Sequence, residues 1–281
     1  MNCVKTINEV RSQIKVWKKE GYSIALVPTM GYLHVGHESL IKRATSENEK
    51  VVVSIFVNPI QFGPNEDLAS YPKDLYSDVL LCKAAGADLI FAPEASEMYP
   101  SDILTNISVS KLTTGLCGAK RPGHFDGVCT VVSKLFNIVS PDKAYFGEKD
   151  AQQLAVIKRM VTDLNFDIEI IGCPIVREED GLAKSSRNFY LSPKERQASL
   201  ILNKSLTKCR ELLSSGEKSA ELIKQIIRNE LESEVLAKID YIEVVDSLSL
   251  SVIEFVHDPI IVAIAVFIGK TRLIDNFIWK S

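Results

Sequence analysis

Residues 23–46 read SIALVPTMGYLHVGHESLIKRATS and contain an apolar run, a turn with two glycines and a more polar run. The apolar run, Ser23–Pro28, predicts a short buried strand, and the segment from His37 to Ser46 predicts a helix. Two of the four histidines of the chain, His34 and His37, lie in the turn. A strand that turns directly into a helix is typical of α/β proteins with a parallel sheet.

The same alternation of strands and helices continues on both sides of this stretch. Lys50–Asn58, KVVVSIFVN, is a continuous apolar run of the kind found in strands that are buried on both faces. From the alternation we predict an α/β fold whose first part is a Rossmann-like parallel sheet covered by helices. The other expected strands are 89–92, 143–146 and 169–171, and the other expected helices are 5–20, 73–86, 128–139 and the segment that follows GEKD at 147–150.

The pattern changes after residue 175. Ser192 and Pro193 are typical of a helix start, with a serine cap before a proline at the first helical position. Helices are expected at 193–214 and 219–232, strands at 239–245 and 260–268, and a third candidate strand at 271–274. We therefore predict two domains, residues 1–175 and residues 176–281, of which the second is a smaller α+β domain.

The composition and charge of the chain exclude some kinds of binding partner. The chain has 281 residues, a formal net charge of −3 and an isoelectric point of about 5.9, which argues against nucleic acid or a membrane as the main partner. The longest apolar run, Ile260–Ile268, is far shorter than the roughly 20 residues of a membrane helix. The first residues contain no apolar signal core and the six cysteines form no C-x-x-C pair, so we expect a cytoplasmic protein with free thiols.

The two-histidine turn allows three interpretations: a metal site, an anion site, or local hydrogen bonding alone. A metal site would need a third ligand at a fixed spacing, and the motif H-E-x-x-H is absent. The turn lies between a strand end and a helix start, where open α/β sheets bind ligands and where the helix dipole favours anions. Gly31 and Gly36 let the backbone approach a ligand closely. This position favours a phosphate site.

Three further loops carry polar groups that suit a polyphosphate or a small polar substrate. Taken singly, each loop is explained at least as well by an ordinary solvated surface, but together they favour phosphate chemistry. The chain has neither G-x-G-x-x-G nor a P-loop motif, so the usual glycine-rich phosphate loops are excluded. The three loops are Asn58 with Gln61, Gly147–Asp150 with Gln153 in the helix that follows, and Lys184–Arg187; Arg121 and His124 add one more cation and one more histidine.

Five stretches, taken together, resemble the pantoate–β-alanine ligase (pantothenate synthetase) family, and they follow the family order across nearly the whole chain. The H-x-G-H turn by itself is shared with the wider nucleotidyltransferase superfamily, including class I aminoacyl-tRNA synthetases, whereas the other stretches are more specific. They are PTMGYLHVGHESLI at 28–41, FVNPIQFGPNEDLASYPKD at 56–74, RPGHFDGVCTVVSKLFNIVSPDKAYFGEKDAQQL at 121–154, PIVREEDGLAKSSRNFYLSP at 174–193 and TRLIDN at 271–276.

The resemblance implies a ligase that works in two steps. ATP and (R)-pantoate give pantoyl adenylate and pyrophosphate, and the amine of β-alanine then displaces AMP to form pantothenate. Mg²⁺ accompanies ATP, no protein metal ligand is implied, and the family is typically a cytoplasmic homodimer. Residues 1–175 would bind ATP and pantoate, and residues 176–281 would close over the substrates.

The resemblance also implies residue roles. His34, His37 and Lys149 would be catalytic, with His37 as the proton donor. Gln61, Gln153 and Asn58 would bind pantoate, and Gln61 would also border β-alanine. The residues implied to contact ATP are Met30, Gly31, Tyr32, Leu33, His34, Val35, Gly36, His37, Gly147, Glu148, Lys149, Asp150, Val176, Lys184, Ser185, Ser186 and Arg187.

Two other interpretations compete with the ligase. A nucleotidyltransferase that stops after AMP transfer would need a cationic pocket for a phosphorylated acceptor, and the neutral Asn58 and Gln61 disfavour it. A non-catalytic nucleotide-binding or RNA-binding relative is disfavoured by the negative net charge. One departure from the family pattern is Lys184, which stands where many relatives have methionine and would add a cation for phosphate.

Overall fold

The computed structural model describes residues 1–64 and 66–280. The chain divides into two compact units that interleave along the sequence. Unit 1 comprises Met1–Val109, Arg121–Glu148 and Val156–Pro174, and unit 2 comprises Ser110–Lys120, Lys149–Ala155 and Ile175–Ser281. The domain division at 1–175 and 176–281 stays a prediction.

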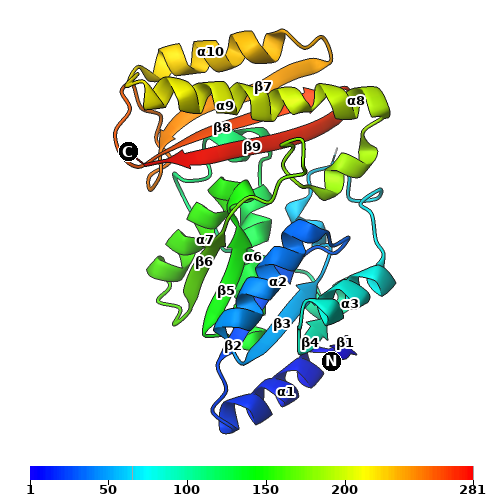
Figure 1. Cartoon of the computed structure of the whole chain (residues 1–281). Helices are drawn as coiled ribbons and strands as arrows, with labels where there is room; N and C mark the ends of the chain where they lie inside the picture. The colour runs from blue at the N-terminus through cyan, green and yellow to red at the C-terminus, as the bar shows by residue number, and fades with distance from the viewer. Residues whose placement is uncertain (65, 281) are drawn as a thin grey trace. The chain divides into compact units, whose positions relative to one another are not determined.

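Unit 1 is built on a six-stranded parallel sheet in the order β1-β4-β3-β2-β5-β6 (Figure 1). The predicted Rossmann-like sheet is therefore confirmed. Its first strand was missed, because three residues are too few to show a hydrophobic period. The strands are β1 (Asn2–Val4), β2 (Ile24–Thr29), β3 (Lys50–Ile55), β4 (Leu89–Phe91), β5 (Lys143–Gly147) and β6 (Glu169–Cys173).

Helices cover this sheet on both faces (Figure 1). Ala25 and Val27 of β2 share a buried cluster with Ile41 and Ala44 of the helix α2. The helix α6 contacts both β2 and α1, so the alternate side chains of β2 are covered on each side. The helical segments of this part of the chain are α1 (Ile7–Lys19), α2 (Val35–Glu47), η1 (Pro59–Gln61), α3 (Leu75–Ala84), α4 (Ala95–Met98) and α6 (His124–Val139), and α7 (Ala151–Asp163) begins in unit 2 and ends in unit 1.

The strand order places a topological switch point at β2. The strand β3 pairs with β2 on one side and β5 pairs with it on the other. In sheets of this kind, ligands bind beyond the carboxyl ends of the two strands where the order reverses. The carboxyl end of β2 leads directly into the two-histidine turn, so the fold puts that turn at the expected ligand position.

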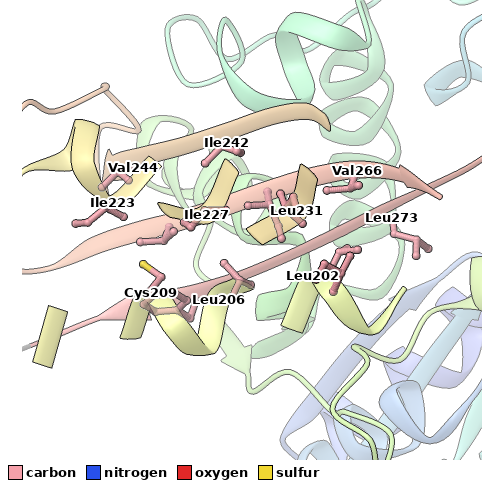
Figure 2. Close-up of a cluster of buried hydrophobic side chains, with 14 of the residues drawn as sticks. Leu202, Leu206, Cys209, Ile223, Ile227, Leu231, Ile242, Val244, Val266 and Leu273 are labelled. Carbon is pink, nitrogen blue, oxygen red and sulfur yellow. The ribbon is translucent and has the colours of Figure 1, made fainter. Parts of the chain in front are cut away.

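Unit 2 contains a three-stranded antiparallel sheet packed against helices. Figure 2 shows Leu202, Leu206 and Cys209 of α9 and Ile223, Ile227 and Leu231 of α10 gathered against side chains of the sheet. The elements are α5 (Leu116–Lys120), η2 (Glu148–Asp150, whose first residue belongs to unit 1), η3 (Ser186–Tyr190), α8 (Pro193–Ala198), α9 (Leu200–Ser214), α10 (Ala220–Glu232), β7 (Ala237–Asp246), β8 (Ile260–Ile268) and β9 (Thr271–Trp279).

Two expectations for this unit differ from the structure in detail. The single helix expected at 193–214 is two helices, α8 and α9, which meet at the buried Ser199. The hydroxyl of Ser199 donates to the carbonyl of Arg196 at 2.6 Å, a side-chain bond that competes with helical hydrogen bonding. The strand β9 extends to Trp279, because its whole length pairs with β8. Within the described residues, no helix has both the length and the apolar character that crossing a membrane requires.

Candidate functional site

The two-histidine turn has a backbone that few residues can adopt. Gly31 and Tyr32, separated from the end of β2 by one residue, both have positive φ, at 86° and 53°. A Cβ added at Gly31 would lie 3.0 Å from a carboxylate oxygen of Asp78 and 3.1 Å from Ile55. Glycine is therefore needed at position 31 both for its dihedral angles and for space.

Asp78, a buried residue of α3, holds this turn from outside. Its Oδ2 accepts the main-chain N–H of Tyr32 at 2.9 Å and its Oδ1 accepts that of Leu33 at 2.7 Å. Burial raises the pKa of the Asp78 carboxyl above its ordinary value, and the bonds from Leu33 and Tyr32 oppose that rise. The sequence does not reveal the role of Asp78, because nothing local links a helix residue to a turn 45 positions away.

The two histidines cap the start of α2 reciprocally. Nδ1 of His34 accepts the N–H of Gly36 at 3.1 Å, and Nδ1 of His37 accepts the N–H of His34 at 3.2 Å. A neutral imidazole that accepts at Nδ1 carries its proton on Nε2. Both rings therefore present Nε2–H donors, with their centroids 4.1 Å apart at the helix N-terminus, where the dipole favours negative charge.

The Asn58–Gln61 segment has its amide orientations fixed by its neighbours. Nδ2 of Asn58 donates to the carbonyl of Gly127 at 3.1 Å and to Oε1 of Gln61 at 3.0 Å. Because a carbonyl only accepts, the first bond decides which end of the Asn58 amide is nitrogen. The Gln61 oxygen then faces Asn58, and its Nε2 contacts Sδ of Met30 at 3.0 Å. This contact joins Gln61 to the two-histidine turn.

Tyr99 completes the set of hydrogen bonds around Asn58. Its hydroxyl donates to Oδ1 of Asn58 at 2.7 Å, and burial raises the pKa of the Tyr99 phenol far above its ordinary range. The hydroxyl therefore stays a donor at physiological pH. With both amide hydrogens and one acceptor position of Asn58 in use, this side chain is arranged to orient Gln61. The sequence does not reveal the role of Tyr99, because this residue lies in a segment with no periodic pattern.

Unit 2 carries the second group of predicted residues, around Lys149. The carbonyl of Lys149 accepts from Nδ2 of Asn276 in β9 at 2.8 Å. The structure also distinguishes two adjacent glutamines. Gln152 is buried and donates through Nε2 to the carbonyls of Leu112 and Gly115, both at 2.9 Å, whereas Gln153 is half-buried. Gln153 is thus the more accessible of the two.

The segment from Val176 to Arg187 is organised around Glu178. One oxygen of its carboxylate pairs with Nζ of Lys184 at 3.3 Å, and the other pairs with Arg196 at 2.7 Å. Burial alone would raise the pKa of Glu178, but the bonds from Arg196 and Asn188 and the charge of Lys184 hold it below its ordinary value. The carbonyl of Val176 accepts the N–H of Lys184 at 2.9 Å. Lys184 is thus part of an ion-pair group with Glu178 and Arg196.

The strand β9 links this segment to Lys149. Asp275, which is buried, pairs with both terminal nitrogens of Arg177 at 2.7 and 2.9 Å, and the next residue, Asn276, holds Lys149. The bidentate Arg177–Asp275 pair therefore anchors the start of the 176–187 segment next to the anchor of Lys149. This arrangement gives a physical reason for the stretch TRLIDN at 271–276, to which sequence analysis assigned no role.

The structure thus gathers the predicted residues into two local groups, one in each unit. Unit 1 contains the residues of the two-histidine turn, Asn58 and Gln61, and also Gly147 and Glu148; unit 2 contains Lys149, Asp150, Gln153, Val176 and Lys184–Arg187. Among residues 1–64 and 66–280, no group of three or more His, Cys, Asp or Glu side chains could hold a metal ion.

Comparison with known proteins identifies one family. The family model described as Pantoate-beta-alanine ligase matches residues 2–278. The chain is 64% identical to a pantothenate synthetase of Clostridium botulinum and 65% identical to one of Clostridium acetobutylicum, in each case over 280 residues and the full length of both chains.

Solved structures agree with these relatives. A pantothenate synthetase from Thermus thermophilus superposes with a TM-score of 0.94 at 45% identity, over 99% of each chain. A pantoate–β-alanine ligase from Francisella tularensis, described as complexed with beta-gamma ATP and β-alanine, gives a TM-score of 0.79 at 37% identity, over 99% of this chain and 97% of the other.

Proposed function

Because the chain belongs to the pantoate–β-alanine ligase family, we propose a role for each group of site residues in its reaction. The enzyme condenses (R)-pantoate with β-alanine in a reaction driven by ATP, through pantoyl adenylate, and releases AMP and pyrophosphate. The observation that carries the proposal is the 3.0 Å contact between Nε2 of Gln61 and Sδ of Met30. It sets an oriented amide donor, suited to an acid substrate, beside a turn suited to phosphate.

In the first step, a carboxylate oxygen of pantoate attacks the α-phosphorus of ATP and pyrophosphate leaves. Two anions must approach each other, so neutralising the phosphate is the main task of the protein. The Nε2–H groups of His34 and His37 donate to phosphate oxygens at the helix N-terminus. Because Nδ1 of each ring already accepts a main-chain N–H, a positively charged ring would lose its cap. The neutral Nε2–H form is therefore the working form, and it stabilises charge by hydrogen bonding.

The acid substrate is recognised by neutral amides. Nε2 of Gln61 donates to an oxygen of pantoate, and Asn58 acts through Gln61 by fixing the direction of that amide. Gln153 is a second amide for pantoate. Gln61 also borders the position of β-alanine, so the same side chain serves both steps. An uncharged pocket suits a substrate whose only charge is the reacting carboxylate.

Residues 147–150 and the segment from Val176 to Arg187 act on the nucleotide. Lys149 is proposed to lie near the α-phosphate and Asp150 to accept from the ribose hydroxyls, with Gly147 and Glu148 completing that turn. Lys184, Ser185, Ser186 and Arg187 supply cations and hydroxyls for the phosphates, and Val176 contacts adenine through its backbone. Two guanidinium or ammonium groups and two hydroxyls match the several oxygens of a polyphosphate.

In the second step the amine of β-alanine attacks the acyl carbon of pantoyl adenylate to form the C–N bond. The acyl C–O bond breaks, AMP leaves with its electron pair, and the attacking nitrogen releases one proton. Holding the amine next to the mixed anhydride turns a bimolecular reaction into an effectively unimolecular one. The acyl adenylate is labile, so the site must also exclude water. No covalent bond between enzyme and substrate is required.

Three features of the working enzyme are proposed on the grounds of family membership. Mg²⁺ enters with ATP as the counter-ion of its phosphates, because Mg²⁺ in such sites is bound largely by phosphate oxygens and water. The enzyme acts as a homodimer. It works in the cytoplasm, a reducing compartment in which its six cysteines stay as thiols; all six are free in the structure.

Isotope exchange between pyrophosphate and ATP tests the first step. We expect exchange to require pantoate and to proceed without β-alanine. Adding β-alanine should then release AMP, and no ADP, in amounts equal to the pantothenate formed. Exchange that is independent of pantoate would contradict the order of steps, and adenylate transfer to a phosphorylated acceptor in place of pantoate would favour the nucleotidyltransferase alternative.

A further inference from the structure

The short helix η1, which carries Gln61, is weakly held by its own hydrogen bonds. The N–H of Gln61 reaches the carbonyl of Asn58 only at 3.5 Å, and the N–H of Phe62 reaches that of Pro59 at 3.4 Å. The N-cap residue Asn58 makes no side-chain capping bond. A single 3₁₀ turn with bonds of this length does not fix a backbone. The position of Gln61 must therefore be set by contacts from elsewhere in unit 1.

The start of α6 supplies the strongest of these contacts. Nδ1 of the buried His124 lies 2.8 Å from the carbonyl oxygen of Gln61. One turn further along, Gly127 leaves no room for a side chain, because an added Cβ would come within 2.7 Å of the backbone of Ile60 and Gln61. The first turn of α6 thus lies directly against the backbone of η1, and His124 provides its polar link.

The partners of His124 settle its tautomer. A carbonyl only accepts, so Nδ1 carries the proton that is donated to Gln61. Nε2 is then the lone-pair nitrogen, and it lies 3.0 Å from Nη1 of Arg121, which can only donate. A protonated ring would turn a second N–H toward the guanidinium. Arg121 therefore holds His124 in the neutral form that donates to Gln61.

Arg121 is in turn fixed by Glu66. The guanidinium binds the carboxylate in a bidentate pair, with Nε to Oε1 at 2.6 Å and Nη2 to Oε2 at 2.7 Å. Burial alone would raise the pKa of Glu66, but the hydrogen bonds and charge of Arg121 hold it below its ordinary value. The main-chain bond from His124 N to Arg121 O, 3.1 Å, closes a turn at Gly123 that sets the guanidinium beside the ring.

We propose that Glu66, Arg121 and His124 form a positioning relay that fixes the main chain of Gln61 and thereby sets the affinity of the enzyme for pantoate. The relay ends on a carbonyl oxygen of the protein, so its members are positioning residues and not catalytic ones. The guanidinium of Arg121 is engaged by Glu66 and His124, which assigns it to this role instead of direct contact with pantoate. The inference rests on the proposed role of Gln61 in binding pantoate.

The test is the KM for pantoate and the KM for ATP, both measured by pyrophosphate exchange. His124→Ala removes the bond to Gln61 and is expected to raise the pantoate KM about 10-fold or more, the effect of losing one buried hydrogen bond, with the ATP KM changed less than about 2-fold. His124→Asn places an amide nitrogen where Nδ1 was, so it should recover most of the pantoate affinity. Arg159→Ala removes an arginine from an exposed pair with Asp163 and is the matched control that should change neither KM.

A double-mutant cycle separates a relay from independent structural effects. If Arg121 acts through His124, then Arg121→Ala should raise the pantoate KM in the wild-type background and have little further effect in His124→Ala. Additive effects, or equal changes in both KM values, would overturn the relay. Absence of pantoate-dependent exchange in the wild type would instead overturn the proposed function. Urea unfolding of each variant shows whether it is folded. If an alanine variant does not fold, Glu66→Gln replaces it, because its amide oxygen can still accept one of the two hydrogen bonds that Arg121 donates.

Discussion

The carboxylate of Asp78 accepts the main-chain N–H of Leu33 at 2.7 Å, and through this bond helix α3 fixes the turn that carries His34 and His37. Asp78→Ala leaves this N–H and that of Tyr32 without their acceptor. We expect it to lower the free energy of unfolding by about 1–3 kcal/mol, the cost of an unsatisfied buried polar group, and to lower kcat. Urea denaturation and pyrophosphate exchange measure the two effects. Asp74→Ala, which removes the exposed cap of the same helix, should cost stability and leave kcat unchanged.

The raised pKa of Asp78 predicts a pH dependence of stability. Because burial raises this pKa above the ordinary 3.8, the folded protein binds the proton more tightly than the unfolded chain does. The stability contributed by Asp78 is then full below pH 3.8 and is lost as pH rises through the folded pKa. Relative to Asp78→Asn, which cannot ionise, the wild type should lose stability over that window. A wild type that gains stability over Asp78→Asn as pH rises would contradict the raised pKa.

Two substitutions of His37 separate the helix-capping role of its Nδ1 from the donor role of its Nε2. In His37→Asn, the side-chain oxygen can replace Nδ1 as acceptor for the N–H of His34, but no group replaces Nε2. We expect stability within about 0.5 kcal/mol of wild type, since a cap is retained, and kcat lower by roughly 10²–10³, the effect of losing one transition-state donor. In His37→Gln the longer side chain can place its amide nitrogen near the position of Nε2 but caps the helix less well. We therefore expect lower stability than in His37→Asn and a smaller fall in kcat. Equal kcat values for the two variants would contradict a donor role for Nε2.

The parallel sheet, the two-histidine turn and the main helices could be predicted because their signals are local. Ser23–Pro28 is apolar throughout most of its length, and the turn follows it immediately. The contacts that fix the turn and Gln61 could not be predicted, because Asp78, Tyr99 and His124 reach them across 45, 41 and 63 positions of sequence. Such pairs depend on tertiary packing, and neither hydrophobic periodicity nor motif spacing carries information about tertiary packing.

The hydroxyl of Tyr99 is expected to set pantoate affinity through Asn58. Tyr99→Phe removes the donor to Oδ1 of Asn58 and keeps the ring, so packing against Phe56 remains. The Asn58 amide then loses one of its three bonds, and we expect the pantoate KM to rise about 3- to 10-fold, as for one neutral hydrogen bond. Gln61→Ala should raise the same KM further and leave that for ATP nearly unchanged. If Tyr99→Phe raises both KM values equally, the link through Asn58 is wrong.

Asn276 is expected to govern the position of Lys149. Its side-chain amide donates to the Lys149 carbonyl at 2.8 Å, and Asn276→Ala removes that bond without touching the ammonium group. We expect kcat to fall by about 10-fold, as one hydrogen bond at a reacting centre contributes, whereas Lys149→Ala should cost more. Single-turnover formation of AMP and pyrophosphate measures both. If Asn276→Ala abolished the formation of AMP and pyrophosphate and Lys149→Ala left it unchanged, the proposed role of Lys149 would be wrong.

The ion pair between Lys184 and Glu178 limits how much Lys184 can add to the affinity for ATP. The pair is partly exposed, so breaking it costs at most about 1 kcal/mol. A phosphate that recruits the ammonium must compete with Glu178, and the net gain in ATP affinity should be small. We therefore expect Lys184→Met, which removes the ammonium group and keeps an unbranched apolar chain, to raise the ATP KM only about 2- to 5-fold, in line with a surface charge pair. The increase should shrink as salt is raised, because added ions screen the charge that is removed.

A second substitution shows whether the ammonium acts on ATP or on the protein. Glu178→Gln abolishes the negative charge that Lys184 and Arg196 share, so it frees Lys184 for phosphate but loosens the 176–187 segment. If Lys184 contacts phosphate, the ATP KM of Glu178→Gln should rise when Lys184→Met is added. If Lys184 only holds the segment together, Lys184→Met should have no further effect in the Glu178→Gln background. Measuring the ATP KM by pyrophosphate exchange in the two single variants and the double variant decides between the two roles.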